Sequence, residues 1–326
     1  MPQDATAPPP DSPHLLIPLA ASHAPGCQQQ LPQLVLPHLA RLLPALSLVQ
    51  QDSGQETDFS LPHERALARH LGLPADASGS LPWAAWQALQ QRLPGAAGQA
   101  WAYVTPCQWQ IGADSVVMTD PARLPLQEAE SRALLDILAP WFAQDGITLH
   151  YQQPTRWLAS GAPLAGLACA ALERVTGRDV RPWLPDIAQA RSLHRLHSEM
   201  QMLLYTHPFN EQRADRGQPP INAFWLHGAG PLTAAPPPDT PPPDMPGELL
   251  EAALREDWPA WARAWQALDA GPLARLAAQA RAGQPVRLTL CGERSALHWQ
   301  ARPRGLWARI KGHFGQIPLS DVGNQL

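Results

Sequence analysis

The chain has 326 residues, enough for about two domains with a sizeable core. Its net charge of −4 argues against a general nucleic-acid binder, and Lys311 is its single lysine, so any anion site must be built from arginine or histidine. The sequence has no apolar run of about 18 residues, no charged and apolar leader and no Cys-x-x-Cys pair, which predicts a cytoplasmic, reduced protein without a membrane span.

The first hundred residues predict one strand followed by short helices. Residues 1–12 are rich in proline and are expected to form a disordered tail. His14–Ala20 is a short apolar run typical of a strand, and three prolines divide the leucine-rich stretch 28–46 into short helices. Two further helices are predicted at Pro62–Leu71 and Trp83–Leu93, with a glycine just beyond each end.

From Trp101 onward the pattern changes to strands separated by longer helices. Pro125–Leu138 predicts a helix, with proline in its first turn and Pro140 beyond its end. Leu167–Val175 fits a strand or a helix equally well. Alternating strands are predicted at Trp101–Thr105, Ser115–Thr119, Gly146–Gln152 and Thr155–Ser160, the last two as a hairpin across Pro154.

The clearest helix of the chain is Asp186–Tyr205. Asp186 is suited to cap it, Pro208 stops it, and its apolar residues form one face. Asn222–Leu226 then predicts a buried strand that leads into a glycine turn. The residues of the apolar helix face are Leu193, Leu196, Met200, Leu203 and Leu204.

Residues 231–247 hold eight prolines and predict an extended linker or surface loop. Helices follow over Glu248–Ala282, broken at Pro259 and at Gly271-Pro272, and their tryptophans share one face, which favours a core over a cofactor site. Val286–Cys291 and Ala296–Ala301 alternate well and predict a hairpin. The fold class expected is α/β, with a mixed sheet core and helices.

One stretch resembles a known family. The motif is H-P-x-N-x-x-R-x-x-x-G-x-P-P-x-N-x-x-W-L-x-G-x-G, and it is similar to the archaeal-type, cofactor-independent phosphoglycerate mutases of the alkaline phosphatase superfamily. A closer similarity is to the bacterial RpfE-type regulatory proteins. The motif residues are His207, Pro208, Asn210, Arg213, Gly217, Pro219, Asn222, Leu226, Gly228 and Gly230, and upstream matches include Thr105-Pro106, Asp120, Glu128-Ala129, Asp145-Gly146, Arg156, Gly177-Arg178 and Leu184-Pro185.

The resemblance implies two lobes. Residues 13–100 with 220–326 would form a degenerate catalytic-type lobe of the alkaline-phosphatase and phosphoglycerate-mutase kind, which contains the proline segment. Residues 101–219 would form a smaller substrate-type lobe. Local pattern alone also allows a separate C-terminal domain.

The sequence departs from the family where the metals should bind. The family's first strand ends in Asp-Gly, but here it ends Ile17-Pro18-Leu19-Ala20, and no Asp-His pair occurs anywhere. The one Gly-His pair, Gly312-His313, has no acid nearby. Phosphoryl transfer through a serine needs two metals that neutralise charge, and these need several converging carboxylate and imidazole ligands. We therefore expect no catalytic residue, metal or cofactor.

Two arginines are candidates for an anion site, and each has a structural alternative. The resemblance places anion contacts at Arg156 and Arg213, but either residue would equally pair with a local acid. His207 would bind a carboxylate or phosphate, or else cap a helix. Asn210 and Asn222 would contact a ligand, or else brace the backbone of the loop between them.

Other candidates lie beside these residues. His227-Gly228-Ala229-Gly230 would form a backbone anion nest or a plain turn, and the nest would involve His227, Gly228 and Gly230. His194 and His197 lie one helical turn apart and would hold a metal only with a third ligand, which the sequence does not place.

The function predicted is a non-catalytic, phosphoglycerate-mutase-like regulatory or interaction protein. It would bind a small phosphorylated or carboxylated metabolite, or a protein partner at the proline segment or at exposed tryptophans. The alternative is an active metal-dependent phosphoglycerate mutase or related phosphotransferase with relocated ligands.

Overall fold

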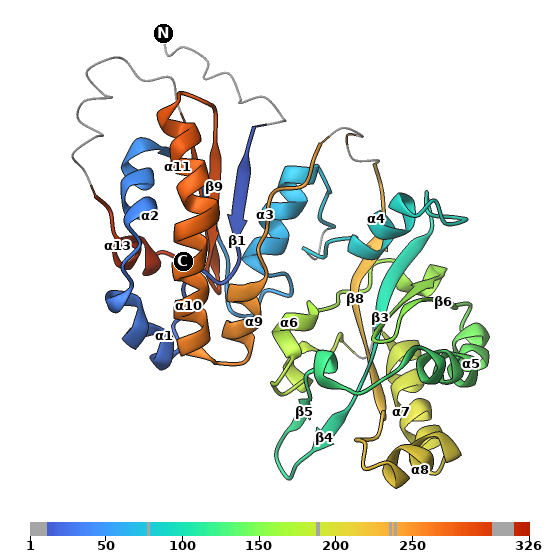
Figure 1. Ribbon diagram of the computed structural model, residues 1–326. Helices are drawn as coiled ribbons and strands as arrows, with labels where there is room; N and C mark the ends of the chain where they lie inside the picture. Colours follow the sequence, from blue (N-terminus) through green and yellow to red (C-terminus); the bar gives the residue numbers. More distant parts are fainter. Residues whose placement is uncertain (1–11, 77–78, 187–189, 235–236, 238–239, 302–315) are drawn as a thin grey trace. The chain divides into compact units, whose positions relative to one another are not determined.

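The computed structural model describes most of the chain, and Figure 1 shows its elements. Nearly all of the predicted N-terminal tail and the Gly312-His313 pair lie outside the described residues. The described residues are 12–76, 79–186, 190–234, 237, 240–301 and 316–326.

The chain divides into two compact units, each with its own core. Unit 1 comprises residues 1–57, 61–72 and 237–326, and unit 2 comprises residues 58–60 and 73–236. The sequence placed the change of lobe at residues 101 and 220 instead. The difference has two causes. The segment before residue 101 provides a helix that packs on the sheet of unit 2, and the segment after residue 220 provides a strand of that sheet.

Unit 1 contains a four-stranded sheet. Its strand order is β1-β9-β10-β2, and only the β1–β9 pair is parallel. The predicted hairpin after residue 286 is confirmed as β9 and β10, whereas β2 was not predicted because its side chains are mostly polar and half-exposed. The strands are β1 (His14–Ile17), β2 (Ser47–Ser53), β9 (Arg287–Cys291) and β10 (Ser295–Gln300).

The two faces of this sheet are covered differently. Leu15, Ile17, Leu288 and Leu290 belong to a large apolar core with the tryptophan-bearing helices, whereas the opposite face lies under α3 (Pro62–Leu71). The remaining helical segments of unit 1 are α1 (Pro25–Gln30), η1 (Leu31–Gln33), α2 (Pro37–Leu42), η2 (Leu43–Ala45), α9 (Glu248–Leu254), α10 (Trp258–Leu268), the π-helical turn η6 (Asp269–Leu273), α11 (Ala274–Arg281) and α13 (Leu319–Gly323).

The proline segment adds backbone to this sheet. Asp244 forms a parallel bridge with Leu15, and its backbone exchanges hydrogen bonds of 2.9 Å with His14 and Leu16. The predicted tryptophan core is confirmed, because Trp261 and Trp265 are fully buried in it. The helices are interrupted between Leu254 and Trp258, and Pro259 lies in the first turn of α10, where proline needs no N–H partner.

Unit 2 is built on an antiparallel sheet of order β6-β7-β3-β8, with a small β4–β5 ribbon. The predicted hairpin across Pro154 is confirmed as β6 and β7. The strands are β3 (Ala100–Cys107), β4 (Trp109–Ile111), β5 (Val116–Met118), β6 (Thr148–Gln153), β7 (Arg156–Ser160) and β8 (Ala223–Pro231).

Helices cover both faces of this sheet. Alanines of α4 pack on Trp101 and Tyr103, and α5 and α7 supply the apolar core on the other side. Among the described residues, no helix combines the length and apolar character needed to cross a membrane. The helical segments are α4 (Trp83–Gln90), η3 (Pro121–Arg123), α5 (Glu128–Gln144), η4 (Ala162–Leu164), α6 (Leu172–Val175), η5 (Arg181–Trp183), α7 (Arg191–Tyr205) and α8 (Pro208–Asp215).

Two predicted boundaries in unit 2 are wrong. Helix α5 runs past Pro140, which is exposed, so the lost hydrogen bond faces solvent while Leu138 and Phe142 stay buried. Helix α7 begins at Arg191, with Ala190 at its N-cap instead of Asp186. The predicted end of α7 at Tyr205 is confirmed, and Pro208 also opens the first turn of α8.

Candidate functional site

The structure brings two of the predicted site residues together on one face of the unit 2 sheet. Arg156 is the first residue of β7, and its guanidinium carbon lies 5.4 Å from the centre of the Tyr103 ring. His227 on β8 is paired with Tyr103, and the two ring centres lie 5.0 Å apart. Thr105 Oγ1 lies 3.2 Å from His227 Nε2. A cation, an imidazole and a hydroxyl thus converge around one aromatic ring.

Among the described residues, this group contains one cation and no acidic side chain. Burial, followed by the nearby Arg156 charge, lowers the pKa of His227 to about 3, so the imidazole is neutral near pH 7. Burial raises the pKa of Tyr103 to about 12, so the phenol keeps its proton. The Nε atom of Arg156 is buried and has no hydrogen-bond partner among the described residues. Arg156 is therefore the only charged member of the group.

The glycine at position 228 allows helix α4 to approach this face. Gly228 has a φ of +59°, and a Cβ atom there would lie 3.0 Å from Trp83 Cβ and 3.1 Å from the Tyr103 ring. His227-Gly228-Ala229-Gly230 is also part of β8, which continues to Pro231, and is not a turn after the strand. Close packing against Trp83 and Tyr103 thus explains why position 228 is a glycine, and this explanation requires no anion nest.

Arg213, by contrast, follows its structural alternative. It is completely buried, and its Nη1 lies 2.8 Å from Glu130 Oε2. Its Nε donates to the Pro219 carbonyl at 2.9 Å and Nη1 to the Pro125 carbonyl at 3.3 Å. Its Nε and Nη1 therefore hold the loop after α8 against α5, while its buried Nη2 has no hydrogen-bond partner among the described residues.

The remaining predicted residues of the motif also bind the backbone. His207 Nδ1 accepts from the Phe209 N–H at 3.1 Å and caps α8. Asn210 donates to the carbonyls of Leu204 and Ile221, at 2.9 Å each, and accepts from the Ile221 N–H. These contacts hold the loop in place, and the structure does not bring His207 or Asn210 to Arg156.

Asn222 and the histidines of α7 also bind the backbone. The Asn222 amide exchanges hydrogen bonds of 2.8 and 3.0 Å with the backbone of Trp109. His194 Nε2 lies 2.8 Å from the Pro185 carbonyl, and His197 Nε2 lies 3.0 Å from the Phe224 carbonyl. Both imidazoles therefore act as donors to the backbone rather than as a metal pair.

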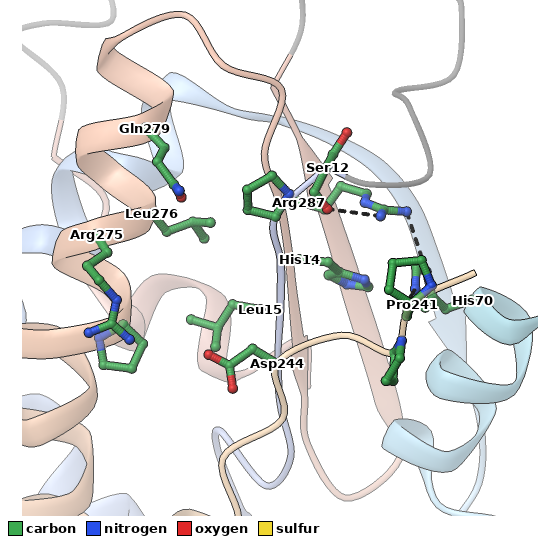
Figure 2. A pocket seen from close by; sticks show the side chains of 13 residues that line it. Ser12, His14, Leu15, His70, Pro241, Asp244, Arg275, Leu276, Gln279 and Arg287 are labelled. Carbon is green, nitrogen blue, oxygen red and sulfur yellow. Dashed lines mark hydrogen bonds between the residues drawn. The ribbon is translucent and has the colours of Figure 1, made fainter. Parts of the chain in front are cut away.

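A polar group that the sequence analysis missed lies in unit 1. His14, His70 and Arg287 form part of the wall of a cavity of about 370 Å³, which Figure 2 shows. His14 and His298 share the hydroxyl of Thr289, at 2.8 and 2.7 Å. The signal was present as inward-facing polar residues within alternating strands, but His14 and its partner Thr289 lie 275 residues apart in the chain.

The edge where β1 and β9 end is the place where an α/β sheet usually binds its ligands. Here the chain fills part of this edge with its own groups. The indole N–H groups of Trp261 and Trp265 donate to the carbonyls of Leu19 and Ala20, at 2.9 and 3.2 Å. The carbonyl of the buried Leu326 accepts from the Ser295 N–H at 3.0 Å.

The metals that the family resemblance implies do not fit the side chains of the described residues. Among the described residues, no three His, Cys, Asp or Glu side chains are arranged to hold a metal ion. The four cysteines are free and buried, and burial raises the pKa of each thiol. They are therefore poor nucleophiles and poor metal ligands.

Comparisons with known proteins give remote structural similarity alone. No protein-family model matches the chain, and no curated protein matches it. A cofactor-independent phosphoglycerate mutase from Thermoplasma acidophilum aligns over 94% of this chain and 95% of its own, with a TM-score of 0.36 and 13% identity. The PH0037 protein from Pyrococcus horikoshii aligns over 89% and 87%, with a TM-score of 0.40 and 15% identity. Similarity this remote transfers no function to the chain.

Proposed function

We propose that this protein binds a small phosphorylated or carboxylated metabolite without transforming it, and that it acts as a regulatory or interaction protein. The observation that carries the proposal is Arg156, a half-buried cation whose buried Nε has no hydrogen-bond partner among the described residues. A buried donor that stays unpaired costs about 1–3 kcal/mol, and more for a charged group. An anionic ligand would remove this cost.

The neighbours of Arg156 suit an anion better than a cation. Carboxylates and phosphates are held by arginine through parallel N–H donors. The Thr105 hydroxyl and the neutral His227 ring share one hydrogen bond, so the pair keeps one further donor for a ligand, and neither group carries a negative charge. Tyr103 is held in place from α4, because its hydroxyl lies 3.3 Å from both the Trp83 carbonyl and Gln87 Oε1 and donates its one hydrogen between them.

The absence of catalysis is proposed on chemical grounds. Transfer of a phosphoryl group through a serine requires charge neutralisation that a pair of metal ions normally provides. The described residues contain no side-chain group suited to hold one metal ion. The single guanidinium of Arg156 is able to bind an anion, but it offers no activated nucleophile and no general base.

The test is calorimetric titration of the full chain with 3-phosphoglycerate. We expect binding to the wild-type protein and a loss of affinity of about tenfold or more for Arg156→Gln, because a hydrogen bond to a charged group is worth about 1.5–3 kcal/mol. Arg191→Gln is the matched control, since Arg191 is exposed in the same unit. Its affinity should equal that of the wild type.

Two results would contradict the proposal. Equal affinity of the wild type and of Arg156→Gln for 3-phosphoglycerate would show that this ligand does not bind at Arg156. Conversion of 3-phosphoglycerate in the presence of Mn²⁺ would show that the protein is an enzyme. In that case a chelator should abolish both the conversion and the stoichiometric binding of metal.

A further inference from the structure

A second polar site lies in unit 1, on the sheet face beneath α3. Successive strand residues point to opposite faces, so the leucines of β9 enter the core while Arg287 and Thr289 face α3. His14 is paired with Arg287, and His298 is paired with Thr289. The cluster thus occupies the ends of β1 and β9 where these strands begin, away from the edge where they end.

The side chains of this cluster surround a cavity. A cavity of about 240 Å³ is lined by polar side chains from four strands and one helix. It adjoins the cavity of about 370 Å³ drawn in Figure 2, since His14, His70 and Arg287 line both. The lining side chains of the smaller cavity are His14, Gln50, Ala66, Arg69, His70, Arg287, Thr289, Ala296 and His298.

The lining of the smaller cavity is cationic. It includes the guanidiniums of Arg69 and Arg287, and no carboxylate is found among its described lining residues. Asp52 lies nearby, but its Oδ2 is 3.1 Å from both Arg65 Nε and Arg69 Nη2. One carboxylate is thus shared between two arginines.

The histidines of the cluster differ in how they are held. His70 Nε2 lies 2.9 Å from the Pro241 carbonyl, which only accepts, so this nitrogen carries the proton. The other nitrogen of His70 faces Arg287 Nη1 at 3.4 Å. Both nitrogens of His70 are therefore occupied. These two contacts fix His70 as a neutral ring. His14 and His298 are therefore the rings whose protonation is able to change when a ligand binds.

The Thr289 hydroxyl connects those two rings. Thr289 Oγ1 lies 2.8 Å from His14 Nε2 and 2.7 Å from His298 Nδ1, and a hydroxyl donates to one ring while accepting from the other. His14 Nδ1 is buried and has no hydrogen-bond partner among the described residues. Because Nδ1 of His298 is used by Thr289, Nε2 is left as its ligand-facing nitrogen.

We infer that this smaller cavity binds a compact tetrahedral oxyanion, a phosphate- or sulfate-type group, and that binding is coupled to uptake of a proton by the His14–Thr289–His298 chain. The anion would face Arg69, Arg287 and His298 Nε2. The site is separate from the Arg156 group, which lies in unit 2. A metal ion is disfavoured by the two lining guanidiniums and by the ligand geometry of the described residues.

The proton coupling follows from the charges around the rings. Burial is the main cause that lowers the pKa of His298 to about 4, followed by the neighbouring Arg287, Arg69 and His70. Burial, then His298, His70 and Arg287, lower the pKa of His14 to about 2. Both rings are thus neutral without a ligand near pH 7. A dianion raises their pKa values, so affinity should increase as the pH falls toward the ligand-free value of His298.

The experiment is calorimetric titration of the full chain with sulfate, which keeps its charge over the pH range used. Titrations at pH 7.5, 6.5 and 5.5 in two buffers of different ionisation enthalpy report the number of protons taken up. We expect the dissociation constant to fall as the pH falls, by at most about tenfold per pH unit for one proton. The Arg156→Gln variant serves as the background, so that sulfate at the Arg156 group does not contribute.

Two variants locate the site. His298→Asn keeps an amide near the Nδ1 position for Thr289 and removes Nε2, and we expect at least fivefold weaker binding with no dependence on pH. Arg69→Gln should weaken binding while keeping the pH dependence. The matched controls, His23→Asn and Arg263→Gln, are exposed residues of the same unit and should leave both properties unchanged.

Opposite outcomes would overturn the inference. The site would be ruled out by sulfate binding that is unchanged in both His298→Asn and Arg69→Gln. It would also be ruled out if a folded Arg156→Gln protein bound no sulfate at pH 5.5. Tight binding of Zn²⁺ that is lost in His298→Asn would assign the cluster to a metal. Glycerol 3-phosphate binding more tightly than inorganic phosphate would support a phosphomonoester as the occupant.

Discussion

His197 shows how a single buried imidazole couples stability to pH. It lies within the core of unit 2, with Nε2 3.0 Å from the Phe224 carbonyl, and burial lowers its pKa to about 3. An unfolded histidine titrates near pH 6.5. Because the unfolded state binds the proton first, the stability from this group is complete above about pH 6.5 and is lost as the pH falls toward 3.

We therefore expect the free energy of unfolding to fall between pH 6.5 and 4, by up to about 1.4 kcal/mol per pH unit for each such histidine. Urea unfolding at several pH values measures this slope. His197→Gln should lower stability at pH 7.5 but give a shallower slope, because the variant cannot take up this proton. An equal slope in the two proteins would show that His197 does not titrate on unfolding.

The candidate sites also show what a sequence reveals at the residue scale. Arg156 and His227 were both singled out, yet nothing in the sequence indicated that they share Tyr103, because strand register sets that distance. Arg213 was left open between a ligand and an acid, and only burial and the Glu130 partner decide its contacts. The His14–Thr289 contact joins residues 275 positions apart, which local patterns cannot place together.

At the scale of elements, the tryptophan helix α10 holds the loop after β1. Leu19 has a φ of +46°, an uncommon conformation for a residue with a branched side chain, and its carbonyl accepts from Trp261 Nε1 at 2.9 Å. Trp265 Nε1 donates to the next carbonyl, that of Ala20. The two indoles therefore hold a loop whose backbone conformation is costly in itself.

Trp261→Phe tests this role. Phenylalanine keeps most of the apolar ring but leaves the buried Leu19 carbonyl without its indole donor, which should cost about 1–3 kcal/mol. Thermal and urea unfolding of unit 1 measure the loss. Trp258→Phe, on the same helix, is the control, because its indole takes no part in holding this loop. A smaller loss for Trp261→Phe than for Trp258→Phe would argue against the proposed role.

Elements with strong local patterns were predicted and those set by tertiary contacts were not. The β6–β7 and β9–β10 hairpins and α3 follow from alternation, turn residues and helix stops. Strand β2 has the exposed, polar sequence of a loop, and it forms because β10 offers it an edge for pairing. Helix α5 continues through Pro140 because its buried face outweighs one missing hydrogen bond on the exposed side.

At the scale of the whole molecule, the boundaries of unit 2 follow from its sheet. Strand β3 is paired on one side with β7 and on the other with β8, and α4 packs on the same strand. A lobe cut at residues 101 and 219, as the sequence suggested, would lack both α4 and β8. It would expose Trp101 and leave β3 as an unprotected edge.

We expect residues 73–236 alone to fold, and residues 101–219 to remain without fixed tertiary structure. The longer fragment keeps the buried Trp101 and Trp157, so it should show a near-ultraviolet circular dichroism signal and cooperative urea unfolding. Its stability should fall by about 1–3 kcal/mol, because the Ala171 N–H loses the Phe59 carbonyl and Arg174 loses that of Ser60. Cooperative unfolding of the shorter fragment would show that β8 and α4 are dispensable to the core.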